Sequence, residues 1–129
     1  TCENLLKADG KMVIQAITVP DERYETYRCG IDWIRKHIFP GGHLLSLHII
    51  RKIISEKTYL KIDETEEIGP HYVRTLREWR DRLNAHLKEV RELGFDRNFL
   101  RKWNYYLACC EGGFASGELG DVQMVLHKT

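Results

Sequence analysis

The first half of the chain carries two kinds of apolar pattern. Residues 12–17 are almost continuously apolar, which is typical of a strand covered on both faces in an α/β sheet. Apolar side chains between Tyr24 and Ile38 recur at spacings of three and four, which predicts one helix that ends at residues 39–42. Ser46 is placed to cap a second helix whose apolar face includes Ile50 and Ile53.

Alternating side chains predict two further strands. Residues 59–68 alternate in part, which favours a half-exposed antiparallel strand. Residues 122–126 alternate apolar and polar side chains at the end of the chain, which predicts a last strand.

Two long helical patterns lie between these strands. A stripe of large apolar side chains over residues 72–93 predicts the longest helix, and Gly94 gives it a C-terminal stop. Residues 99–110 predict another helix, interrupted at Gly112 and Gly113. The fold class is therefore α/β, with about three strands in a mixed or antiparallel sheet and about four to five helices in residues 1–129, taken as a single segment.

Composition excludes some classes of function. Lys and Arg number 20 against 19 for Asp and Glu, so the net charge of +1 provides no global field for nucleic acid. The sequence has neither a spanning apolar run nor a signal sequence, which predicts a cytoplasmic protein that could associate peripherally with a membrane. The residues that follow Thr1 are typical of the end of an amphipathic helix, so we expect the chain to be part of a longer protein.

The cysteines and histidines do not predict a metal site. The spacing of the four cysteines forms no Cys-x-x-Cys pair, and that of the six histidines forms no helical ligand pair with a supporting carboxylate. We therefore expect structural thiols and surface histidines.

Basic and aromatic residues each allow two interpretations. The arginines from Arg74 to Arg82, mixed with acidic residues at helical spacing, indicate a solvated face with ion pairs. A smaller basic set near Trp33 and Phe39 is an alternative head-group surface. The aromatic residues of the two late helices favour core packing, with a phenol pointing into a cavity as the alternative for Tyr72 and Tyr106.

Three stretches together resemble the cyclopropane-fatty-acyl-phospholipid synthase and mycolic acid cyclopropane synthase family. They are KADGKMVIQAIT with the later HIFPGG, then GPHYVRTLREW, then KWNYYLACCEGGF with the following DVQMVLHK. Their order and spacing span nearly all of the chain, and the resemblance covers the C-terminal part of the family only.

The resemblance implies part of a Rossmann-like class I methyltransferase fold. Residues 12–17 resemble its fifth strand, the strand near residue 60 its sixth, and residues 122–126 its seventh, which lies antiparallel between the other two. The family holds S-adenosylmethionine with a glycine-rich loop and an acidic residue earlier in the fold. Both would precede Thr1, so we expect no cofactor-binding residues in this segment.

The resemblance also implies a reaction and its residues. The parent enzyme transfers the methyl group of S-adenosylmethionine to a double bond of a lipid acyl chain, and a bound bicarbonate ion accepts a proton. By position, Tyr106 matches the tyrosine that holds the bicarbonate, and Ile17 matches a backbone contact to it. Gln15 replaces the usual histidine; its amide can donate a hydrogen bond to the anion, and both ring closure and simple methylation stay open. The residues expected to bind the acyl chain are Tyr72, Phe39 and Trp79.

Three hypotheses on function follow. The first is a segment of a lipid-modifying methyltransferase, inactive alone, whose parent acts on phospholipid acyl chains or at a membrane surface. The second is a non-catalytic module that binds a lipid or a protein, and the third is a truncation product without function. Because residues 12–17 would have an unpaired edge, we also expect a homodimer or other self-association.

Overall fold

The computed structural model describes residues 2–128, which form an α/β fold. The strands are β1 (Lys11–Val19), β2 (Leu45–Ser46), β3 (Leu60–Glu67) and β4 (Gly120–Lys128). The helices are α1 (Cys2–Leu5), α2 (Tyr24–Cys29), α3 (Trp33–His37), α4 (Leu47–Lys57), α5 (Gly69–Ala85), α6 (Leu87–Glu92) and α7 (Arg97–Ala115), with a 3₁₀ turn at Asp21–Arg23.

The sheet has the order β2-β1-β4-β3, so the last strand lies between two earlier ones, as predicted. β4 pairs antiparallel with both β1 and β3. The expectation of three strands was one short, because β2 pairs in parallel with the end of β1 through Leu45 and Ser46. Two residues cannot show a periodic pattern, so this strand could not be predicted from the sequence.

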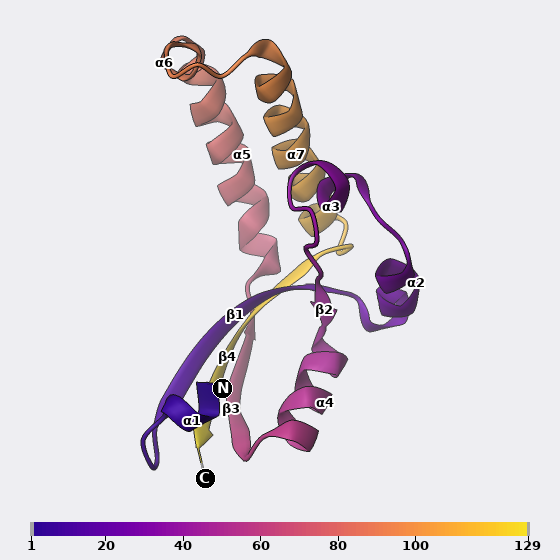
Figure 1. Ribbon diagram of the computed structural model, residues 1–129, viewed down its shortest axis with the longest axis vertical. Coiled ribbons are helices and arrows are strands. Elements are labelled where there is room, and N and C mark those ends of the chain that lie inside the picture. Colours follow the sequence, from indigo (N-terminus) through magenta and orange to yellow (C-terminus); the bar gives the residue numbers. More distant parts are fainter. Residues whose placement is uncertain (1, 129) are drawn as a thin grey trace.

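Apolar side chains gather in two separate clusters. The first lies between the sheet and α4 and is built around Ile50, Met124 and Leu126. The second joins α5 to α7 around Leu76 and Leu107. Figure 1 shows α5 and α7 running side by side away from one end of the sheet, with α3 beside α7. The polar residues described below lie where this helical hairpin meets the strands.

β1 is covered on one face only, which corrects the expectation of burial on both faces. Met12 and Ile14 pack toward α4, whereas Val13 is 65% exposed and Ile17 is 40% exposed on the opposite face. Gln15 projects from this open face as well, because alternate residues of a strand point to the same side.

The single helix expected over residues 24–38 is two short helices. α2 ends at Cys29, and α3 begins at Trp33 after an extended segment. The carboxylate of Asp32 accepts a hydrogen bond from the backbone N–H of Arg35 at 2.8 Å, so it caps a new helix at this point. Ile31, which the pattern placed on the buried stripe, is 75% exposed.

The capped helix after Ser46 is confirmed. The Ser46 hydroxyl accepts a hydrogen bond from the N–H of Ile49 at 3.4 Å, and Ile50 is buried. Ile53 lies on the predicted apolar face but is 46% exposed.

The two long helices differ from expectation at their ends. The first divides at His86 into α5 and α6, and Gly94 then has a φ of +94°, as a C-terminal stop requires. α7 continues through the predicted interruption to Ala115. A Cβ at position 113 would lie 2.8 Å from Leu119 Cδ1, so this glycine serves a close packing contact rather than a break in the helix.

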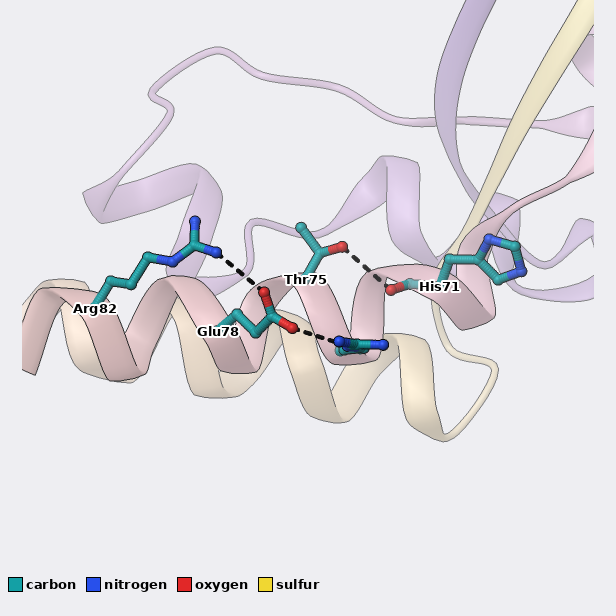
Figure 2. Close-up of polar contacts among 5 residues, drawn as sticks. His71, Thr75, Glu78 and Arg82 are labelled. Atoms are coloured by element: carbon teal, nitrogen blue, oxygen red, sulfur yellow. Dashed lines mark hydrogen bonds and ion pairs between the residues drawn. The ribbon is translucent and has the colours of Figure 1, made fainter.

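The basic residues of α5 separate into two groups. Glu78 pairs with Arg74 and Arg82, with distances of 2.8 and 3.1 Å between charged atoms, and Figure 2 shows Glu78 pointing toward Arg82 on the same helix. This part of the segment is a solvated face of ion pairs, as predicted. Arg77 and Arg80 instead reach the carboxylate of Glu111 on α7, each at 2.9 Å, and join the two helices of the hairpin.

Candidate polar site at the hairpin base

A hydrogen-bonded cluster on the open face of the sheet connects three elements. The side-chain amide of Gln15 on β1 donates to the hydroxyl of Tyr72 on α5 and to Oδ2 of Asp121 on β4, each at 2.8 Å. Its carbonyl oxygen accepts from the amide of Gln123 on β4 at 3.1 Å. Both N–H groups of Gln15 are therefore bound within the protein.

Strand register and the start of α5 bring these groups together. Gln15 lies directly opposite Gln123, and Ile17 directly opposite Asp121, in the antiparallel pairing of β1 with β4. Tyr72 follows the first residues of α5, and its ring stacks on Phe114 of α7 with centroids 5.2 Å apart. This stacking fixes the direction of the phenol toward the sheet.

Asp121 is a fully buried acid, with 0% of its surface exposed. Its Oδ1 is buried and has no hydrogen-bond partner among the described residues. Burial raises the pKa of the Asp121 carboxyl, and the nearby Glu67 adds to the rise, whereas Gln15 and the Tyr72 hydroxyl lower it. Burial has the largest effect, so the structure favours the protonated form more than water does.

Glu67 closes the cluster on the side of β3. Its Oε1 accepts the backbone N–H groups of Gly69 and Asp121 at 3.1 and 3.0 Å. A Cβ at position 69 would lie 2.7 Å from this oxygen and 3.1 Å from the Asp121 nitrogen, so only glycine allows α5 to start this close to β4. The two carboxyl groups are thus held next to each other.

Tyr106, which the resemblance assigns to the bicarbonate site, lies in a different environment on α7. Its ring contacts Phe39 and Trp103, with centroids 5.8 and 5.3 Å apart. Burial raises the pKa of its phenol to about 12, and burial likewise raises the pKa of the neighbouring Cys110 thiol to about 11. No hydrogen bond links Tyr106 to Gln15 in residues 2–128.

The aromatic residues form a row along α7. Neighbouring rings stack from Phe95 to Phe99, at 4.3 Å, and from Phe99 to Trp103, at 5.4 Å. Tyr106 and Phe39 extend the row, and Tyr72 packs against the same hairpin core. Of the residues predicted to bind an acyl chain, Tyr72 and Phe39 belong to these contacts, whereas Trp79 lies on α5 and is 47% exposed.

Sequence reasoning missed the acidic part of this cluster. The alternation near the end of the chain predicted only a strand, and no local pattern marked Asp121 or Glu67 as a neighbour of Gln15. The available signal was that Asp121 and Gln123 lie on the strand face opposite the apolar Val122, Met124 and Leu126. Their partners could not be known without the register.

Within residues 2–128 no group of His, Cys, Asp and Glu side chains has an arrangement suited to a metal ion. In the same residues, none of the helices has both the length and the apolar character needed to cross a membrane.

A family model described as mycolic acid cyclopropane synthetase matches residues 1–124. The chain belongs to this family. Its members are S-adenosylmethionine-dependent enzymes, and the chain has the α/β fold of their C-terminal region.

Relatives from two organisms are similar over most of the chain. A tuberculostearic acid methyltransferase of Mycobacterium tuberculosis is 43% identical over 126 residues, which is 98% of this chain and 30% of that protein. The cyclopropane-fatty-acyl-phospholipid synthase of Escherichia coli is 30% identical over 96 residues, which is 74% of this chain and 24% of that protein. The chain therefore spans about a third or less of these relatives.

A crystal structure of the mycolic acid cyclopropane synthase CmaA1 complexed with SAH and CTAB has the same fold. It superposes with a TM-score of 0.84 and 28% identity, covering 97% of this chain and 46% of that one.

The family resemblance implies a bicarbonate ion at Gln15, and the Gln15 amide as it is oriented here does not fit one. An anion needs N–H or O–H donors, but both N–H groups of Gln15 are bound to Tyr72 and Asp121. In this arrangement the Gln15 amide has no N–H group left for an anion, and the contact between them stays a prediction. A buried carboxyl group beside the amide, when ionised, also repels a second negative charge.

Proposed function

We propose that the chain is the C-terminal part of an S-adenosylmethionine-dependent enzyme that methylates an unsaturated acyl chain of a phospholipid or related lipid. Membership of the family supports the reaction class, and the lipid-related names of the relatives support the substrate class. The observation that carries the proposal is the polar cluster of Gln15, Tyr72 and Asp121 at the edge of an aromatic hairpin core. A peripheral position at a membrane is consistent with a lipid substrate.

In this proposal, S-adenosylmethionine bound outside the present residues supplies an electrophilic methyl group. The aromatic faces of Phe39, Tyr106 and Trp103 contact the acyl chain and exclude water. Such faces also stabilise the positive charge that develops on the acyl chain, because the ring quadrupole attracts cations. Tyr72 joins the polar cluster to this apolar surface through its hydrogen bond with Gln15. Ile17 lies on the open face of β1 beside Gln15.

We favour methyl addition over ring closure. Gln15 has no proton to gain and lose near neutral pH as a histidine has, and the relative with 43% identity is named a methyltransferase. Proton NMR of the modified lipid distinguishes a methyl or methylene branch from a cyclopropane ring. A ring as the main product would contradict this part of the proposal.

The test uses the parent polypeptide, meaning the longest natural chain that contains residues 1–129. Labelled methyl groups from S-adenosylmethionine should enter unsaturated phospholipid in vesicles and should not enter saturated phospholipid. Residues 1–129 alone should bind S-adenosylmethionine no better than millimolar, which calorimetry can check. A parent that binds lipid vesicles but transfers no methyl group would instead favour the non-catalytic module.

Two tyrosine variants separate the assignments made from resemblance and from geometry. Tyr72→Phe removes the hydroxyl that Gln15 contacts, whereas Tyr106→Phe removes a hydroxyl beside Cys110. We expect the parent to lose more turnover with Tyr72→Phe, because a hydrogen bond in a charged network contributes about 1 to 3 kcal/mol. A larger loss of turnover with Tyr106→Phe would favour the site at Tyr106 that the family resemblance implies.

We also propose that the chain self-associates through the open edge of β1. β2 pairs only with Thr18 and Val19, and no described strand covers residues 11–17 on that side. An unpaired edge beside the exposed Val13 is a template for another strand. Light scattering coupled to size exclusion should show a dimer that Val13→Lys weakens, and a monomer at all concentrations would contradict it.

A further inference from the structure

The chain contains a buried carboxyl group without a cationic partner, next to the site proposed above. Asp121 has no exposed surface, and its Oδ1 lacks a hydrogen-bond partner among residues 2–128. A carboxylate kept in a purely structural role is normally paired with a cation or saturated with donors. The remaining capacity of Asp121 to accept a proton therefore needs an explanation.

The orientation of Gln15 fits an ionised Asp121. A carboxylate only accepts hydrogen bonds, and the Gln15 amide turns its nitrogen toward Asp121 and its oxygen toward Gln123. The same nitrogen donates to the Tyr72 oxygen, which leaves the hydroxyl proton of Tyr72 free to be donated. The Tyr72 hydroxyl and Oδ2 of Asp121 therefore lie against the same Gln15 nitrogen, each at 2.8 Å from it.

We propose that Asp121 accepts the proton released during the reaction, through the hydroxyl group of Tyr72, and that the chain thereby carries its own base in place of bicarbonate. This inference rests on the proposed function. Asp121 acts through Tyr72 and does not touch the lipid, because its side chain is fully buried.

The proton transfer balances without another reactant. Methyl addition to a carbon–carbon double bond leaves a carbocation on the acyl chain. A neighbouring C–H bond breaks, and its electron pair forms a new carbon–carbon bond or double bond. The proton goes to the Tyr72 oxygen while the hydroxyl proton of Tyr72 goes to the Asp121 carboxylate. Asp121 returns the proton to water after the product leaves.

The groups around Asp121 suit this role. Glu67 on β3 is the charged group that faces it, Tyr72 approaches from α5, and Gln15 is neutral on β1. Burial and the negative charge of Glu67 raise the pKa of Asp121, which makes its carboxylate a stronger base. Turnover should therefore fall as the pH is lowered through this raised pKa.

The first test measures methyl transfer by the parent polypeptide in buffer freed of carbon dioxide and in buffer with added bicarbonate. We expect equal turnover in both and a loss at acidic pH. Asp121→Asn should lower turnover by about 100-fold or more and abolish the acidic loss, with binding of S-adenosylmethionine unchanged. Circular dichroism checks that the variant is folded.

The matched control is Asp63→Asn, which changes an exposed aspartate that contacts His127 at the other end of β4. It should keep the turnover and pH profile of the wild type. If the wild type requires bicarbonate for turnover, the role of Asp121 is overturned but the proposed function stands. Full turnover by Asp121→Asn would also overturn the role of Asp121.

The second test does not depend on activity. In residues 1–129, carboxyl ¹³C NMR should report a raised pKa for Asp121 that moves together with the signals of Tyr72, and the Tyr72→Phe variant should lose this coupling. A normal pKa for Asp121, or signals of Tyr72 that ignore its titration, would contradict the inference even if the parent is inactive under every condition.

Discussion

Two acidic side chains with little exposed surface lie in contrasting surroundings. Glu111, whose side chain is 12% exposed, sits between two arginines of the facing helix, at 2.9 Å from each. Asp121, at 0% exposure, has an amide, a hydroxyl and a second carboxylate as neighbours and no cation. A paired acid holds elements together, whereas an unpaired one costs stability and is retained for another reason.

The largest stability effect should come from breaking the paired acid. Glu111→Gln leaves Arg77 and Arg80 without the charged partner that joins α5 to α7, so the free energy of unfolding should fall by about 2 kcal/mol. Urea unfolding of the wild type and the variant measures the change.

The matched control is Glu78→Gln, the same substitution at a glutamate that also bridges two arginines, but on the surface of α5 (Figure 2). Solvent screens this pair, so the loss should be clearly smaller. Equal losses for both variants would mean that burial does not distinguish the two ion-pair clusters.

Asp121→Asn should have the opposite sign at neutral pH. Asparagine keeps the acceptor for Gln15 and removes a buried negative charge, so the free energy of unfolding should rise by about 1 kcal/mol. A raised pKa means that the folded state binds the proton more tightly, so the penalty in the wild type appears as the pH rises through the raised pKa and vanishes below the unfolded value. The free energies of unfolding of the wild type and the variant should converge at acidic pH. A variant that is less stable than the wild type at every pH would contradict this.

The sequence revealed the elements of the molecule better than its acidic cluster. The strands at both ends, the Ser46 cap and the Gly94 stop each follow from local patterns, and the resemblance placed the last strand in the centre of the sheet. The break between α2 and α3 depends on whether Asp32 caps a helix or lies on its surface, which periodicity does not decide. The contacts of Gln15 with Asp121 join residues 106 positions apart, so they depend on strand register.

A smaller effect is expected from Glu67→Gln. Glutamine keeps the oxygen that accepts from Gly69 and Asp121 and removes the like charge, so the pKa of Asp121 should fall toward its usual value. Carboxyl ¹³C NMR of Asp121 measures the shift. A pKa that rises or stays constant would show that Glu67 does not affect the charge state of Asp121.

The most direct measurement of the central claim follows the side-chain amide of Gln15 by ¹H–¹⁵N NMR in residues 1–129. The claim is that both N–H groups are held by Tyr72 and Asp121 and are not offered to an anion. Bicarbonate added against sodium chloride of equal ionic strength should leave these signals in place, and lowering the pH should shift them with the titration of Asp121. Saturable shifts on adding bicarbonate, with no response to the protonation of Asp121, would contradict the account.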